Sequence, residues 1–404
     1  MIYVGIDWSE KQHDVCVMDA AGGVLSKGRV PDGFEGVARL HEMVAAHAEE
    51  PSGVAVGIEL DRGLLVGALV AAGYQVHAVN PLSVDRYRDR HRTSGAKSDP
   101  GDARVLADLV RTDRHLHREV AGDTELAESV KVLARAHQSL IRSRQRQLNQ
   151  LRSALREFYP AALEAFGTDL ASADALAVLG AAPTPVAGRS LSVARIATVL
   201  KRGGRRRRIS ERAREIRTAL RSSQLEAPQV VARAYGEVVR STVRIVAEMT
   251  EQVEGLEREL EARFEEHPDA EILRSLPGLG SVLGARVLAE FGDDPTRYAD
   301  PKARKNYAGT SPITKASGRS RVALARFARN RRLADALDMW AFCSLTSSDG
   351  GRRCYDAHRA KGKTHRQALR HLANRWVGIL HGCLRHRQPY REDIAWLTSV
   401  EAAA

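Results

Sequence analysis

The chain has 404 residues, with 62 lysines and arginines against 50 aspartates and glutamates, so its formal net charge is +12. This length excludes a single small binding module, and the positive charge favours a polyanionic partner. The four cysteines have neither disulfide nor metal-ligand spacing, and no apolar run is long enough to span a membrane, so we expect a cytoplasmic protein without a membrane partner.

The charge is divided unevenly along the chain. Residues 1–120 carry 14 basic and 18 acidic side chains, whereas residues 121–404 carry 48 basic and 32 acidic ones. We therefore expect an acidic N-terminal domain and a basic remainder with different roles.

The first 120 residues alternate between strand and helix patterns. Three strand patterns come first, in MIYVGID, HDVCVMDA and GGVLSKGRV. A helical pattern, a short buried strand, a second helical pattern and a strand ahead of Pro81 follow, and another helix begins near Asp99. This order predicts a mixed α/β sheet in residues 1–120, with functional side chains at the strand ends.

Four carboxylates in this domain are candidates for a metal site. Asp7 and Glu59 each end a predicted strand, and Asp99 and Asp102 lie three residues apart on one helical face. If the two strands are neighbours, the four side chains converge and repel one another unless a cation lies between them. Mg²⁺ prefers oxygen ligands and promotes phosphoryl transfer, so we expect Mg²⁺, with Mn²⁺ as a substitute. The alternative for Asp99, Pro100 and Asp102 is an ordinary helix cap.

Two long amphipathic helices are predicted next. Residues 121–160 and 230–268 carry apolar side chains at steps of three and four, which is typical of a coiled coil within one chain or between chains. The region between them, 161–229, is predicted as a basic helical or linker region. We interpret its arginine run as a nucleic-acid contact, because adjacent cations repel one another unless a polyanion is bound, and the alternative is a solvated charge run. The run consists of Arg205, Arg206, Arg207 and Arg208.

Residues 269–392 form the C-terminal domain and begin with a helix–turn–helix pattern. The turn PGLG contains Gly278 and Gly280, whose backbone N–H groups suit a phosphate, as in a helix-hairpin-helix element. An ordinary turn between two helices uses glycines in the same way. Residues 301–332 then contain ten basic side chains and no acidic one, which indicates contact with a phosphate backbone. Residues 393–404 are a tail.

Two sets of motifs resemble one family. YVGIDWSEKQHDVCV, VGIEL and SDPGDARVLADL are similar to the Asp, Glu, Asp, Asp signature of the RuvC-like domain in the DEDD insertion-sequence transposases, the bridge-RNA-guided recombinases. LPGLGSVLGARVLAEFGD, YAGTSPITKASGRSR and GKTHRQALRHLANRWVGILHGCL are similar to the C-terminal transposase domain of that family. The resemblance covers almost the whole chain. It implies an α/β RNase H/RuvC-like N-terminal domain, long coiled-coil helices, and a mostly α-helical C-terminal domain with a helix-hairpin-helix-like element.

The resemblance also implies a nucleophilic serine. In that family, a serine before a glycine in the C-terminal domain attacks a DNA phosphate and forms a covalent phosphoserine link, and the matching residue here is Ser317. The glycine permits close approach, and the neighbouring cations can neutralise phosphate charge. From the residues alone, Ser311 and Ser320 rank almost equally with Ser317. The basic side chains of this segment that we expect to bind nucleic acid are Lys315, Arg319, Arg321 and Arg326.

The activity implied by the resemblance is that of a transposase that cuts and rejoins DNA, guided by a structured RNA encoded by the element. We expect a dimer at least, and a tetramer on DNA, because recombination joins two duplexes through four strand cuts, and we expect the protein to be associated with the bacterial nucleoid. The carboxylates of one protomer can then meet Ser317 of another. The alternatives are a metal-dependent junction-resolving nuclease without the serine, a non-catalytic nucleic-acid-binding regulator, and a sugar-kinase-like ATPase, in which glycine usually stands where this chain has Trp8.

Overall fold

The computed structural model describes residues 1–91, 99–120, 122–317, 320–326 and 329–396, and these residues form two compact units. The first unit comprises Met1–Gly122 and the second Asp123–Ala404. The first is a mixed α/β domain and the second is mostly helical, so the predicted fold class is confirmed at this level.

A six-stranded sheet forms the centre of the first unit, with the strand order β3-β2-β1-β4-β5-β6. Strands β1, β4 and β5 are parallel neighbours, whereas β2 pairs with β1 and β3 in antiparallel fashion. Five of the six strands were predicted, and the short β6, antiparallel to β5, was not. The strand bounds are β1 Ile2–Asp7, β2 Gln12–Met18, β3 Val24–Pro31, β4 Val54–Ile58, β5 Gln75–Ala78 and β6 Arg118–Glu119.

Helices cover both faces of this sheet. Helices α1 (Phe34–Ala45) and α2 (Leu64–Ala71) share one apolar core with side chains from one face, including Ile6 and Ile58. Helices α3 (Pro81–His91) and α4 (Asp99–Asp113) share a second core with the opposite face. Because both faces are buried, any functional side chain of the sheet must emerge at a strand end.

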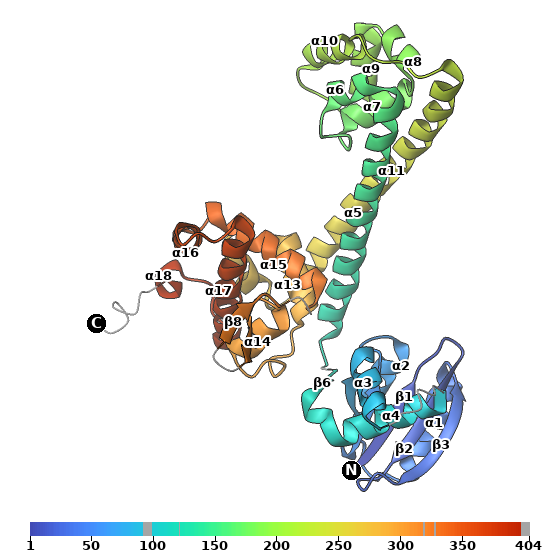
Figure 1. Ribbon diagram of the computed structural model, residues 1–404, viewed down its shortest axis with the longest axis vertical. Helices are drawn as coiled ribbons and strands as arrows, with labels where there is room; N and C mark the ends of the chain where they lie inside the picture. The colour runs from blue at the N-terminus through green and yellow to red at the C-terminus, as the bar shows by residue number, and fades with distance from the viewer. Residues whose placement is uncertain (92–98, 121, 318–319, 327–328, 397–404) are drawn as a thin grey trace. The chain divides into compact units, whose positions relative to one another are not determined.

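Two long helices, α5 (Glu125–Phe158) and α11 (Gln229–Glu265), lie side by side in the second unit (Figure 1). Each contributes to two separate cores, one near each end of the pair. Of the two arrangements left open above, the pair within one chain is therefore the one present. Helices α6–α10 surround the core that includes Phe158 of α5, so residues 161–229 are a folded helical cap. Their bounds are α6 Pro160–Phe166, α7 Ala173–Ala181, α8 Pro185–Ser190, α9 Val193–Arg202 and α10 Ile209–Leu220.

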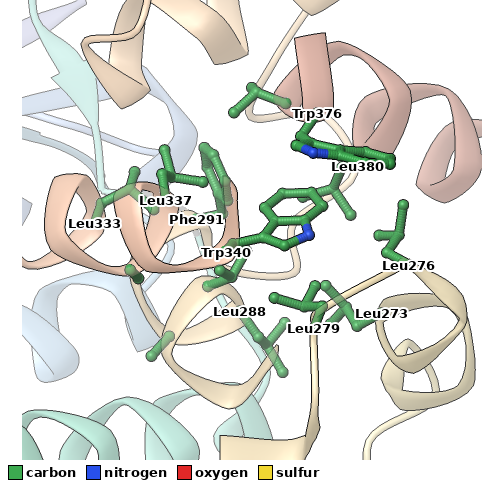
Figure 2. Packing of buried hydrophobic residues seen from close by; sticks show 14 of the residues in the cluster. Leu273, Leu276, Leu279, Leu288, Phe291, Leu333, Leu337, Trp340, Trp376 and Leu380 are labelled. Carbon is green, nitrogen blue, oxygen red and sulfur yellow. The ribbon is translucent and has the colours of Figure 1, made fainter. Parts of the chain in front are cut away.

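The core at the other end of the long helices, which includes Val130 of α5, contains side chains of the C-terminal helices (Figure 2). Trp340 and Trp376 stack at its centre with their ring centroids 5.6 Å apart, and each indole N–H is satisfied, at 3.0 Å by the carbonyl oxygen of Pro277 and at 2.8 Å by Ser344 Oγ. These helices are α12 Ala270–Ser275, α13 Ser281–Phe291, α14 Pro301–Ala308, α15 Arg331–Cys343, α16 Asp349–Ala360, α17 His365–His386 and α18 Glu392–Ala395.

A two-stranded antiparallel sheet interrupts the helical C-terminal domain. Strand β7 (Ile313–Ser317) pairs with β8 (Ser320–Leu324). No strand was predicted in this segment. Within the described residues, no helix combines the length and the apolar character needed to cross a membrane.

Candidate active site

Asp7 and Glu59 end neighbouring parallel strands. Ile6 of β1 lies opposite Ile58 of β4, so the next residue on each chain, Asp7 and Glu59, leaves the same edge of the sheet. Residues two apart on a strand lie on the same face of the sheet. Asp7 and Glu59 therefore lie on the same face as Gly5 and Gly57, which is the face that α4 covers.

Gly5 and Gly57 allow α4 to lie unusually close to the sheet. A Cβ atom on Gly5 would lie 1.9 Å from the carbonyl oxygen of Ala103, and one on Gly57 would lie 2.7 Å from the carbonyl oxygen of Leu106. Only glycine permits such an approach of backbone to backbone. The first turn of α4, which carries Asp99 and Asp102, is thereby held near the sheet edge where the strands end.

The four predicted carboxylates interact electrostatically at this edge. The pKa of Asp7 is raised from 3.8 to about 6, first by burial and then by the negative charges of Asp102, Asp99 and Glu59, with a smaller contribution from Asp14. Like charges disfavour ionisation of a neighbouring carboxyl group, so Asp102, Asp99 and Glu59 lie within electrostatic range of Asp7, although burial is the larger cause of the shift. The structure thus places Glu59, Asp99 and Asp102 in the neighbourhood of Asp7, within range of its charge.

Two arginines compensate part of this acidic cluster, so a metal ion is not the only positive charge available to it. Arg88 of α3 donates to Asp102 at 2.7 Å, and Arg29 of β3 donates to Asp14 at 2.9 Å. Asp14 lies directly opposite Asp7 in the β1–β2 pair. Asp14 was not predicted as part of the site, although it lies in the strand pattern next to the one that ends at Asp7.

The donor chemistry of the cluster suits a hard cation, since its side chains offer carboxylate oxygens. Among the residues that the structure describes, however, no group of three or more aspartate, glutamate, histidine or cysteine side chains is gathered closely enough to hold an ion. Helix α4 begins at Asp99 itself, so this residue lies in the first turn; the position before it, Ser98, is outside the described residues.

Ser317 is the last residue of β7, where it is exposed and pairs with Ser320 across the hairpin. It belongs to the second unit, whereas the four carboxylates belong to the first. Arg319 lies outside the described residues, and the side chains of Lys315 and Arg321, on β7 and β8, are likewise not described. Ser311 precedes the strand and is half-buried, so exposure distinguishes Ser317 from Ser311.

Comparison with known proteins identifies the family. A DEDD model named for IS110 and described as "Transposase" matches residues 4–160, and a model described as "Transposase IS116/IS110/IS902 family" matches residues 270–356. The mini-circle putative transposase for IS117 of Streptomyces coelicolor is 44% identical over 407 residues, which cover 100% of this chain and 98% of that protein. The chain belongs to the IS110/IS116/IS902 transposase family.

Other relatives of the transposase are also similar over nearly their whole length. The uncharacterized 42 kDa protein of insertion element IS900 from Mycobacterium paratuberculosis is 31% identical, with 96% of this chain and 97% of that protein covered. The uncharacterized 44.8 kDa protein of insertion element IS116 from Streptomyces clavuligerus is 31% identical, with 96% and 95% covered. A transposase cleaves and rejoins DNA, so the family establishes the class of enzyme.

The arginine run of the transposase has more internal partners than predicted. Arg205 forms an ion pair with Asp174 at 3.0 Å, and Arg208 forms one with Glu211, so mutual repulsion among four unpaired cations does not describe this segment. Arg206 and Arg207 are exposed. They remain the members of the run that we expect to contact nucleic acid.

The glycines of the PGLG turn differ in their surroundings. A Cβ atom on Gly278 would lie 2.6 Å from the backbone nitrogen of Ser344, so the close packing of this turn on the chain after α15 explains that glycine. Gly280 is exposed and precedes α13. A phosphate contact by Gly278 and Gly280 stays a prediction, as does one by Arg326, which is half-buried.

Proposed function

We propose that this transposase breaks and rejoins DNA strands through a covalent bond to Ser317, with the assistance of an acidic Mg²⁺ site. The observation that carries the proposal is the convergence of Asp7, Glu59, Asp99 and Asp102 at one sheet edge, expressed in the raised pKa of Asp7. A carboxyl group whose pKa is raised by burial and by neighbouring negative charges is a candidate for a functional site. The proposal includes an RNase H/RuvC-like fold for the first unit, which its mixed sheet with helices on both faces supports.

The four carboxylates are the residues that would hold the metal ion, and they would have to move closer together than they lie in the described structure. Mg²⁺, with Mn²⁺ as a substitute, would supply positive charge that polarises a phosphate oxygen and relieves the repulsion among these side chains. Arg88 already neutralises Asp102 in part, so the protein holds the cluster together with one arginine before any cation binds.

In the proposed step, Ser317 Oγ attacks the phosphorus of a DNA phosphodiester. The Oγ–P bond forms, the bond from phosphorus to one deoxyribose oxygen breaks, and that oxygen leaves as a hydroxyl group by taking up the proton that Ser317 gives up, relayed through the acidic site. The hydroxyl proton of Ser317 passes to the acidic site, because a serine hydroxyl is a weak nucleophile without a base. Rejoining reverses this exchange: the hydroxyl group of a different strand attacks the phosphorus, and Ser317 leaves. Each step replaces one phosphoester bond with another, so the bond energy is conserved.

The choice of DNA is proposed to come from base pairing with a structured RNA encoded by the element, while the basic residues contact RNA and DNA backbones by charge. Residues 301–332 contain ten basic side chains and no acidic one, which supports the proposed contacts with nucleic-acid backbones. We further propose a dimer that becomes a tetramer on DNA, in which the carboxylates of one protomer serve Ser317 of another. Mixing an Asp7→Ala chain with a Ser317→Ala chain then restores strand exchange that neither chain performs alone.

The proposal is tested by denaturing gel analysis of the full chain with Mg²⁺, the flanking non-coding RNA and labelled element-junction DNA. Wild type should form a protease-sensitive protein–DNA adduct, and Ser317→Ala and Asp102→Asn should each reduce its rate about a thousandfold or more. Ser311→Ala is the matched control and should retain the adduct. Cleavage by Ser317→Ala without an adduct would instead identify a metal-dependent hydrolytic nuclease.

A further inference from the structure

Helices α16 and α17 pack side by side and are joined by a short turn (Figure 1). Gly362 of this turn has a φ of 73°, and the backbone N–H of Lys363 donates to the carbonyl oxygen of His358 at 3.2 Å, as in a Schellman motif at the end of a helix. Thr364 then begins α17 with a capping box that includes Gln367. Both ends of the turn are closed by hydrogen bonds, so the side chains on it start from fixed backbone positions.

The chain around this turn has no negative charge. Residues 357–391 contain nine lysines and arginines, five histidines and no aspartate or glutamate. Some of these cations have partners, since Arg387 forms an ion pair with Asp269 and Arg375 lies over the ring of Trp396. Those nearest the turn do not: in the described part of the chain, no ion pair is formed by Arg359, Lys361, Lys363, Arg366 or Arg370.

Two histidines stack beside these cations. The rings of His358 on α16 and His371 on α17 are nearly parallel, with their centroids 4.1 Å apart and an angle of 6° between their planes. Burial lowers the pKa of His358, and the positive charges of Lys361 and Lys363 lower it further. Burial also lowers the pKa of His371, which is lowered further by His358, Lys363 and Arg370. The cations therefore lie within electrostatic range of the stacked pair.

We call this surface the basic hairpin. Arg359 belongs to it because its guanidinium group donates to the carbonyl oxygen of Lys363 at 2.7 Å. Neighbouring cations that lack carboxylate partners repel one another, and a polyanion relieves that repulsion. A DNA duplex carries one negative charge per about 1.7 Å of its axis, so one duplex can contact several of these cations, whereas a small anion contacts one or two. The members of the basic hairpin are His358, Arg359, Lys361, Lys363, Arg370 and His371.

We propose that the basic hairpin binds the phosphate backbone of a DNA duplex, and that the stacked pair of His358 and His371 takes up a proton on binding. Phosphates offset the positive charges that disfavour an imidazolium ion here, so the bound pair holds a proton more readily than the free pair. Binding should therefore strengthen as pH falls from about 8 to about 6. That the polyanion is DNA rests on the class of enzyme, and the basic hairpin includes neither Ser317 nor the four carboxylates.

The first test is fluorescence anisotropy of a labelled DNA duplex with the full chain, without added metal ion, over a range of salt concentrations. The double variant Lys361→Gln, Lys363→Gln should weaken binding about tenfold or more and reduce the salt slope by about 1–2, because each lost phosphate contact removes about 0.9. Both lysines are exposed, so the variant should fold. Arg258→Gln with Arg263→Gln removes the same charge from exposed positions of α11 and should bind as wild type does. Equal affinities of the two double variants would overturn the proposal.

The second test concerns the proton. Wild type should bind the duplex about threefold or more tightly at pH 6 than at pH 8, and the double variant His358→Gln, His371→Gln should lose most of this gain. Asp7 titrates in the same range but is unchanged in the variant, so its effect cancels in the comparison. The same gain in wild type and variant would show that the stacked pair takes up no proton on binding.

Replacing the duplex with the labelled flanking RNA distinguishes the two nucleic acids. If the lysine substitutions weaken binding of this RNA and leave affinity for the duplex unchanged, the partner is RNA and the assignment to DNA is wrong. Stronger loss for the duplex supports DNA. None of these measurements involves strand cleavage, so the proposal for Ser317 stands or fails separately.

Discussion

At the scale of single residues, two glycines and one ion pair determine how the carboxylates meet. Gly5 and Gly57 remove the side chains that would push α4 away from the sheet, and Arg88 neutralises Asp102. The four acidic residues were predicted from the ends of strands and from their spacing. The two glycines and Arg88 were not, because their roles depend on which helix packs over which strand, and a short sequence window does not contain that information.

Substituting alanine at Gly5 should destabilise the first unit. The added Cβ atom would overlap the carbonyl oxygen of Ala103, at 1.9 Å, so α4 must shift and the free energy of unfolding should fall by about 3 kcal/mol. Urea unfolding of the full chain measures this change. Gly67→Ala in α2, where a Cβ atom meets nothing within 4 Å, is the control and should be neutral or slightly stabilising. Equal losses in both variants would contradict the close approach of α4.

Removing the charge of Asp7 should raise stability while it abolishes activity. The folded pKa of about 6 exceeds the ordinary value of 3.8, so the folded state keeps a proton that the unfolded chain releases first. The contribution of Asp7 protonation to the free energy of unfolding is therefore fully present below about pH 4 and is lost as pH rises to about 6. Because Asp7 is partly exposed, Asp7→Asn should gain only about 1 kcal/mol at pH 7.5 and nothing at pH 3. Urea unfolding at both pH values checks this, and a loss at pH 7.5 would argue against carboxylate repulsion.

At the scale of elements, the long helices α5 and α11 were predicted from their apolar repeats, and two polar residues within the repeat of α5, His137 and Arg144, contact neighbouring helices. Arg144 of α5 donates to Thr250 of α11 at 3.4 Å. His137 is buried beside Arg286 of α13, and burial followed by that positive charge lowers its pKa to about 4. The repeats predicted helices correctly but left open whether the partner was the same chain, since a repeat specifies a face and not its partner.

The start of α5 is fixed by a buried ion pair whose loss should be costly. Asp123 accepts from Arg297, and their side chains are 2% and 4% exposed; although burial raises its pKa, Arg297 and Lys131 together lower it to about 2. Asp123→Asn leaves a buried guanidinium unpaired and should lower the free energy of unfolding by about 3–5 kcal/mol at pH 7. The exposed pair Arg352–Asp356 provides the control, and Asp356→Asn should change it by less than about 0.5 kcal/mol.

The same substitution has a defined pH dependence. A lowered pKa contributes stability above the ordinary value of 3.8, and this contribution disappears as pH falls to about 2. Urea midpoints of wild type and Asp123→Asn should therefore converge toward pH 2. A difference that stays constant between pH 7 and pH 2 would show that the variant acts through packing and not through charge.

At the scale of the whole molecule, the chain separates an acidic unit from a basic one, as the charge distribution predicted. The uneven charge and the order of strands are readable because they are local or additive properties. The β7–β8 hairpin and the partners of Arg205 and Arg208 were not predicted. Both depend on contacts between residues, and polar, basic segments have no apolar pattern from which such contacts could be predicted. The proposed acidic residues lie in the first unit and the proposed serine in the second, which is why we propose that the two sets meet between protomers.

The central claim is that Ser317 becomes bonded to DNA, and mass spectrometry of the trapped adduct tests it most directly. The full chain is reacted with Mg²⁺, the flanking RNA and element-junction DNA, then digested with protease and nuclease, and the modified peptide is sequenced by fragmentation. We predict a nucleotide phosphate on Ser317. A phosphate on Ser311 or Ser320, or DNA cleavage that leaves every serine of this segment unmodified, would contradict the account.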